Sequence, residues 1–154
     1  MTLRVGLIAR VDSGGLGQMA TEFARGYQPH AALVIDFGKN SRGVSDYDRV
    51  VPYVNEYWVS KGLWDGNPYQ FPTEADLFFD ACDVIVAQET VYDPRSYTIT
   101  RGWGKGLVLH AMPEFLAPTD ASLAPTIWLP TPWHAEAVTV ERVRRGRSAP
   151  IEVP

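Results

Sequence analysis

Short apolar runs alternate with amphipathic or polar stretches along most of this sequence, and each run has the length of one β-strand. The clearest runs are LRVGLIA at 3–9, AALVID at 31–36, DVIVAQE at 83–89, KGLVLHA at 105–111 and APTIWL at 124–129. They are almost continuously apolar, as strands are when helices cover both faces of a parallel sheet. The alternation predicts an α/β fold with a doubly wound, mostly parallel sheet in a single domain over residues 1–154.

The stretches between the runs predict helices. At 18–27, apolar residues recur four apart and predict one stripe facing the sheet, namely Met19, Phe23 and Tyr27. At 73–81 a shorter helix is expected, with Leu77 and Phe78 packed inward. The region after Arg49 contains Pro52, which permits at most an edge strand or a bent strand there.

The composition argues against several classes of protein. The chain is 45% hydrophobic and 21% charged, as ordinary globular domains are. Its 14 Lys and Arg against 18 Asp and Glu disfavour a nucleic-acid binder. The single cysteine, Cys82, excludes a disulfide framework and a Cys-rich zinc site, and we expect it to be packed and inert. No apolar run reaches the length of a membrane span, so a cytoplasmic location is expected.

In doubly wound sheets, ligands bind beyond the carboxyl ends of the strands. His110 closes an apolar run at that edge, where an imidazole can act as a base or a hydrogen-bond donor, or can be a core histidine satisfied by its neighbours. Glu89 and Glu114 supply carboxylates within reach of it. His134, in the first turn of the last expected helix, is either a ligand contact or an exposed side chain.

A glycine-rich turn follows the first run. Gly15-x-Gly17-x-x-Ala20 matches the dinucleotide pattern G-x-G-x-x-A, and Asp36 follows at about the expected spacing of 20 residues. In that pattern the first glycine ends the strand, whereas here residues 10–14 intervene, which disfavours a nicotinamide cofactor. Small residues before a helix would still present backbone N–H groups to an anion, although a connection without any ligand also fits.

Several motifs, taken in order, resemble the retaining glycosyltransferases of the two-domain GT-B fold, family 4. SGGLGQMATEFARGY at 13–27 is similar to the family's glycine-rich turn and helix, and DVIVAQETVYD at 83–93, GLVLHAMPEFL at 106–116 and APTIWLPTPWHAEAV at 124–138 continue the likeness. Glycosyltransferase-like proteins of tailed bacteriophages and some bacteria carry similar segments. The resemblance implies a Rossmann-like domain equivalent to the N-terminal half of a GT-B fold.

The resemblance also implies roles for particular residues. The backbone N–H groups of Gly14, Gly15 and Gly17 would approach the donor diphosphate. His110 would face the transferred sugar and stabilise the transition state by a hydrogen bond. The acceptor hydroxyls, of a glycan or a glycoprotein, would be oriented by Glu89, Thr90 and Glu114.

Such enzymes transfer a sugar, typically a hexose, from a nucleotide-sugar donor without a bound metal or other cofactor. This agrees with Asp46-x-Asp48, which follows a polar loop instead of the apolar strand that a metal-binding D-x-D pair needs. The likeness covers only the first of the family's two domains, so a second Rossmann-like domain or chain is expected, and the chain alone should be inactive. The alternatives are a non-catalytic carbohydrate- or nucleotide-binding module and an NAD-binding domain. A phage-encoded enzyme would work in the host cytoplasm.

Overall fold

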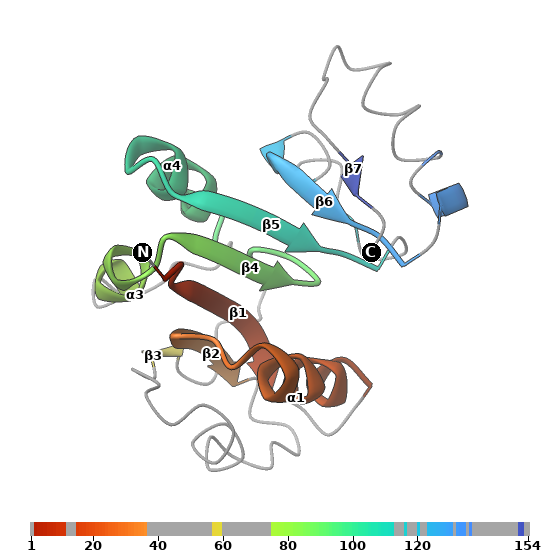
Figure 1. Cartoon of the computed structure of the whole chain (residues 1–154), viewed down its shortest axis with the longest axis horizontal. Coiled ribbons are helices and arrows are strands. Elements are labelled where there is room, and N and C mark those ends of the chain that lie inside the picture. Colours follow the sequence, from red (N-terminus) through yellow and green to blue (C-terminus); the bar gives the residue numbers. More distant parts are fainter. Residues whose placement is uncertain are drawn as a thin grey trace.

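The computed structural model describes residues 2–11, 15–36, 57–59, 75–112, 116, 120, 123–130, 132–134, 136 and 151–152. Within these ranges seven strands form one sheet in the order β3-β2-β1-β4-β5-β6-β7, and every neighbouring pair is parallel. The strands are β1 (Val5–Val11), β2 (Ala31–Asp36), β3 (Tyr57–Val59), β4 (Val84–Gln88), β5 (Gly106–His110), β6 (Thr126–Trp128) and β7 (Ile151–Glu152). The α/β, Rossmann-like class predicted from the alternation is confirmed (Figure 1).

Helices cover both faces of this sheet. From β1 the chain first moves outward to β2 through α1 (Gly15–Tyr27), and later returns to β4 and β5 through α3 (Ala75–Ala81) and α4 (Arg95–Gly102). Right-handed crossovers in opposite directions place α1 on one face of the sheet, and α3 and α4 on the other. We call these the α1 face and the α3–α4 face. The core divides in the same way into two clusters of buried residues, one on each face.

The α3–α4 face holds the larger cluster. Phe78 and Phe79 are fully buried in it and meet edge to face, with ring centroids 5.3 Å apart. Leu77, predicted to pack inward, is 62% exposed, so that prediction was wrong. The buried side of α3 is set by Ala75, Phe78 and Phe79, a spacing of three and four residues that turns Leu77 toward solvent.

The α1 face is packed through small side chains. Among the side chains of α1 that the structure describes, the buried residues are Gly17, Ala20 and Ala24, and this face of the helix packs against Leu7 and Ala9 of β1 among others. The predicted stripe of large residues is therefore wrong in part: Phe23 is half-buried, while Tyr27 is 61% exposed and stacks on the Phe23 ring. Small residues dominate because they let the helix axis approach the sheet closely.

The bounds of β1 differ from the sequence-based expectation in a way that affects the turn before α1. β1 runs two residues further than the apolar run at 3–9, because Arg10 and Val11 still pair with Ile35 and Asp36. Only residues 12–14 therefore separate β1 from α1, fewer than the sequence predicted. At the other end of the sheet β3 is an edge strand, as predicted for that region, while Pro52 itself lies outside the described residues.

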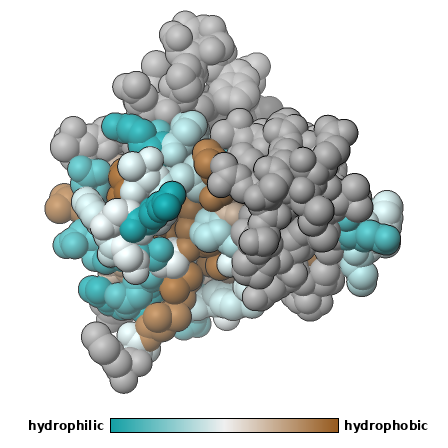
Figure 2. All heavy atoms as spheres, turned by 90° about the horizontal axis from the view of Figure 1, so that it is seen from above, coloured by the Kyte–Doolittle hydropathy of each residue, from teal (hydrophilic) through white to brown (hydrophobic). Residues whose placement is uncertain are grey.

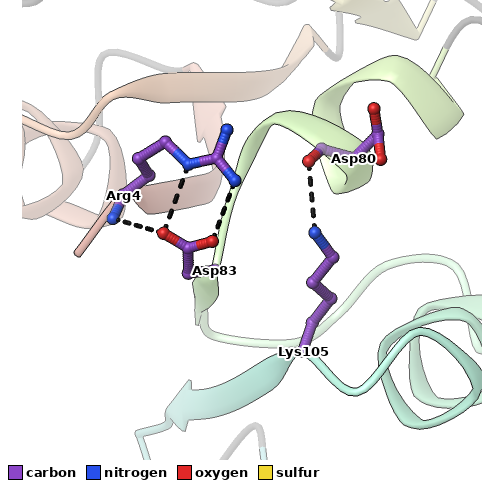
Figure 3. Close-up of polar contacts among 4 residues, drawn as sticks. All are labelled: Arg4, Asp80, Asp83 and Lys105. Carbon is purple, nitrogen blue, oxygen red and sulfur yellow. Dashed lines mark hydrogen bonds and ion pairs between the residues drawn. The ribbon is translucent and has the colours of Figure 1, made fainter. Parts of the chain in front are cut away.

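The amino ends of the strands are tied together by polar contacts (Figure 3). The Arg4 guanidinium donates to both carboxylate oxygens of Asp83, from Nε at 3.2 Å and from Nη2 at 2.9 Å, and the Arg4 backbone N–H donates to the same carboxylate at 2.9 Å. These hydrogen bonds lower the pKa of Asp83 to about 2. Lys105 Nζ donates to the backbone carbonyl of Asp80 at 3.1 Å, which links the start of β5 to α3.

Large hydrophobic side chains are exposed on several of the described elements. Seen from above in Figure 2, a strip of hydrophobic residues runs between hydrophilic ones. The large hydrophobic side chains that are most exposed lie on separate elements: Leu3, Tyr27, Leu77, Trp103, Leu123 and Trp133. Within the described residues no helix combines the length and apolarity needed to cross a membrane.

Candidate functional site

The strand order reverses between β1 and β4, so the switch point of the sheet lies where the carboxyl ends of these two strands meet. Side chains alternate between the faces along each strand. Ile8, Ala87 and Leu109 belong to the core of the α3–α4 face. Gln88 and His110, which follow Ala87 and Leu109, therefore point to the α1 face, and Arg10 points to the α3–α4 face. The two faces of this edge carry different chemistry.

On the α3–α4 face, a charged group bridges the switch point. Arg10 Nη1 lies 3.4 Å from Glu89 Oε2, and the Tyr92 hydroxyl donates to the same oxygen at 3.0 Å. The Glu89 side chain is only 10% exposed. Glu89 and Tyr92 both have positive φ, 72° and 60°, a conformation that costs free energy for residues with a side chain. These contacts hold the strained turn that follows β4.

A second polar cluster anchors the same turn. The buried carboxylate of Asp120 accepts a hydrogen bond from Thr90 Oγ1 at 3.0 Å and another from the Tyr97 hydroxyl at 2.7 Å. Asp120 follows β5 in the sequence, whereas Tyr97 belongs to α4. The cluster therefore ties the region after β5 to the β4–α4 turn, and it engages the hydroxyl of Thr90 in a structural contact.

On the α1 face, two polar side chains lie side by side. Gln88 of β4 pairs with His110 of β5 in the sheet register, and the His110 ring meets the Trp128 ring edge to face at 6.3 Å. Gln88 is 3% exposed, and among the described residues neither atom of its amide group has a hydrogen-bond partner. The buried Nδ1 of His110 also has none there. Burial lowers the pKa of His110, so its imidazole is neutral at pH 7.

The start of α1 lies at this same edge and on this same face. Gly15 is its first residue and is exposed, while Gly17 is buried in its first turn. Backbone N–H groups in the first turn of a helix have no partner within the helix, and they carry the positive end of its dipole. Neither glycine ends β1, which stops at Val11, so the glycines do not occupy the positions of a dinucleotide fingerprint.

The predicted site residues thus separate into groups. His110, Gly15 and Gly17 share the α1 face, but Glu89 does not face His110: its carboxylate turns to Arg10 and Tyr92 on the other side. The two residues are linked through the backbone, where the Glu89 N–H donates to the His110 carbonyl at 2.8 Å. His134 is half-buried beside Trp133, with ring centroids 4.1 Å apart. Gly14, Glu114 and the Asp46-x-Asp48 pair lie outside the described residues.

No family model matches this sequence, and no curated protein matches it. The resemblance to glycosyltransferases therefore stays a prediction, and the function has to be argued from the chemistry of the sheet edge. Over the described ranges, no group of three or more His, Cys, Asp or Glu side chains is arranged to hold a metal ion.

The rule that ligands bind beyond the carboxyl ends of the strands selects Arg10, Gln88 and Tyr92 from the sequence, but sequence reasoning gave them no role. It did not select Asp120. For Gln88 a signal exists in the sequence, because in the alternating series Val84, Val86, Gln88 a polar residue falls where an apolar one is expected. Arg10 likewise extends the series Leu3 to Ala9 with a charge. Asp120 gives no such signal, since it stands in a polar, proline-containing segment.

Proposed function

We propose that this chain is the acceptor-side, Rossmann-like domain of a glycosyltransferase, which transfers a sugar from a nucleotide-sugar donor to a glycan or glycoprotein. One observation carries the proposal: the amide group of the buried Gln88 and the Nδ1 atom of its half-buried neighbour His110 have no hydrogen-bond partner among the described residues. Both side chains share an edge and a face of the sheet with the start of α1. The helix start suits a phosphate group, and the two neutral side chains suit sugar hydroxyls. A nucleotide sugar combines both groups in one molecule.

The proposed roles follow from this arrangement. During transfer the bond between the anomeric carbon and a diphosphate oxygen breaks, and a bond to an acceptor oxygen forms. The N–H groups at the start of α1, around Gly15, would stabilise the charge that develops on the leaving diphosphate. His110, as a neutral imidazole, would donate a hydrogen bond to the sugar. A second Rossmann-like domain or chain would hold the nucleotide, and the expected compartment is the cytoplasm.

Binding to the purified chain tests the proposal. We expect calorimetric titration with UDP-glucose and GDP-mannose to give a binding isotherm for at least one of them. His110→Ala should weaken that binding tenfold or more. His30→Ala is the matched control, because His30 is exposed and precedes β2 at the opposite edge of the sheet. The proposal would be contradicted if neither donor binds, or if His110→Ala and His30→Ala weaken binding equally.

Turnover provides the second test. The chain alone should transfer no sugar, because it would supply only one wall of the cleft. In the complete enzyme, assembled with its second domain or chain, His110→Ala should lower kcat about 100-fold, the cost of losing one hydrogen bond to the transition state. Circular dichroism should show the same fold for both forms. Sugar transfer by the 154-residue chain itself would overturn this division of roles.

An NAD-binding domain is the second candidate, and one contact favours it. Asp36 ends β2 and pairs with Val11 at the carboxyl edge, where a carboxylate could bind a ribose hydroxyl. NAD is therefore included in the titration. Tight binding of NAD that is lost in Asp36→Ala, without binding of nucleotide sugars, would replace the glycosyltransferase proposal with this one.

A further inference from the structure

Gln88 is a polar side chain whose burial the described part of the fold does not explain. It lies at the carboxyl end of β4, which is paired with β1 on one side and with β5 on the other. Only 3% of its surface is exposed. A carboxamide has two donor hydrogens and an acceptor oxygen, and leaving all of them unpaired in the interior is costly. Such a group in a stable fold calls for a partner that the described side chains do not supply.

The neighbour of Gln88 narrows the chemistry of that partner. His110 lies beside it in register and offers a buried Nδ1 that also lacks a partner among the described residues. Both groups are neutral, since burial lowers the pKa of His110. Both also present lone pairs next to their N–H donors. A hydroxyl group, which donates and accepts at once, fits such a pair, whereas a phosphate oxygen only accepts and leaves the lone pairs of both groups unused.

The two parts of the edge therefore suit different parts of a ligand. The start of α1 favours negative charge through its dipole. The Gln88–His110 pair, further along the same edge on β4 and β5, favours an uncharged group that carries hydroxyls.

We propose that Gln88 is a specificity-determining residue that reads hydroxyl groups on the uncharged sugar portion of the ligand, with His110 as its partner. This inference rests on the proposed function, because it names the part of the substrate that this pair contacts. The roles proposed above for the start of α1 and for His110 do not include this role of Gln88.

Replacing Gln88 by methionine tests the role directly, because methionine has a similar shape and no polar group in the amide position. If Gln88 is kept for its ligand, Gln88→Met removes an unsatisfied group, and the melting temperature of the free protein should rise or stay the same. A fall in melting temperature would instead show that the amide supports the fold, and would overturn the proposal. Gln28→Met, at an exposed glutamine after α1, is the control.

Nuclear magnetic resonance then tests the ligand class. The side-chain amide signals of Gln88 should shift on titration with methyl glycosides of glucose, galactose, mannose or N-acetylglucosamine, and should not shift with inorganic phosphate. Gln88→Met should weaken glycoside binding tenfold or more, and Gln28→Met should not. A Gln88 signal that responds to phosphate, or to none of the glycosides, would overturn the inference.

Nucleotide probes separate this inference from the proposed function. UDP and GDP lack the sugar, so Gln88→Met should leave their affinities unchanged while it weakens UDP-glucose or GDP-mannose. If glycosides shift Gln88 but no nucleotide sugar binds, the sugar-reading role stands and the glycosyltransferase proposal fails. If nucleotide sugars bind equally well to the wild type and to Gln88→Met, the glycosyltransferase proposal stands and the role of Gln88 in sugar recognition fails.

Discussion

Arg10 of β1 lies 3.4 Å from the Glu89 carboxylate, so one ion pair spans the two strands between which the strand order reverses. The Tyr92 hydroxyl shares the same oxygen. Glu89 and Tyr92 are also two of the non-glycine residues with positive φ in the described chain. The ion pair and the hydrogen bond therefore offset backbone strain in the turn that follows β4, on the face opposite to Gln88 and His110.

Neutralising this carboxylate should destabilise the protein. Glu89→Gln keeps the shape of the side chain but removes the charge that Arg10 faces, and we expect a loss of roughly 1–3 kcal/mol in the free energy of unfolding, as for hydrogen bonds to charged groups. Urea denaturation measures it. Glu22→Gln, in the exposed pair with Arg25 on α1, should change stability by less than about 0.5 kcal/mol. Equal effects at both positions would show that the Arg10 pair adds no stability.

Removing a hydrogen-bond donor from the buried Asp120 carboxylate should also destabilise the protein. Tyr97→Phe removes the hydroxyl that donates to it at 2.7 Å, and should cost about 1.5–3 kcal/mol. In Asp120→Ala the same tyrosine change should cost much less, because the acceptor is already gone. Tyr27→Phe, on the exposed side of α1, is the control. Strict additivity of Tyr97→Phe and Asp120→Ala in chemical denaturation would contradict the cluster.

Gly6 is fixed by close packing, and a methyl group there should destabilise the fold. A Cβ on Gly6 would lie 2.7 Å from Cys82 Sγ and 2.9 Å from Phe78 Cζ, both in the buried core. Overpacking of this kind costs about 1–3 kcal/mol. Gly26→Ala is the matched control: nothing lies within 4 Å of its added Cβ, and alanine in a helix should stabilise by about 0.5–1 kcal/mol. Denaturant midpoints should therefore move in opposite directions.

Cys82 should react with thiol reagents only when the protein opens. Its side chain is fully buried, and burial raises the pKa of the thiol to about 11. At pH 8 about one molecule in a thousand would then carry the reactive thiolate. We expect the absorbance change with a disulfide reagent to be slow in buffer and immediate in 6 M guanidinium chloride. Fast labelling of the native protein would contradict the prediction that Cys82 is packed and inert.

The tie between Arg4 and Asp83 predicts how acid affects the fold. Because the pKa of Asp83 is about 2 in the folded protein and lies near 4 in an unfolded chain, the unfolded state binds more protons between these values. The contribution of Asp83 is thus complete above about pH 4 and is lost as the pH falls toward 2. Asp83→Asn should remove this part of the acid dependence in denaturation curves taken from pH 2 to 6. The effect should be modest, since both side chains are partly exposed.

A suitable control for that experiment is Asp76→Asn, on the exposed side of α3. It removes one charge without touching Arg4. If the two variants show the same dependence on pH, the pair with Arg4 is not the cause.

The sheet could be predicted because a parallel strand that is covered on both faces needs a nearly continuous apolar run of a few residues, and such runs are visible in the sequence. β2 has the predicted bounds, Ala31–Asp36, and the strands before Glu89 and Ala111 differ by only a residue or so at each end. Helix faces were less predictable. A stripe of large residues on α1 suggested burial, but the close approach of helix and sheet selects Ala20 and Ala24, and leaves Tyr27 outside.

Only the location of the site at the carboxyl edge of the sheet could be predicted from the order of strands and helices. His110 and the glycines share an edge because parallel strands end together. The direction of each side chain depends on alternation along the strand and on backbone geometry, and the positive φ of Glu89 cannot be read from its sequence neighbours. Partners that are distant in the sequence, such as Asp120 for Thr90, follow from the tertiary fold alone.

The central place of β1 has a consequence for synthesis on the ribosome. β1 emerges before the other described strands, yet its pairing with β4 joins residues 79 positions apart, as the contacts of Arg4 with Asp83 and of Arg10 with Glu89 show. Until β4 has left the exit tunnel, one side of β1 has unpaired amide and carbonyl groups. The nascent chain therefore exposes a strand edge while the residues between β1 and β4 are translated, and a chaperone that shields such edges would raise the yield of folded protein.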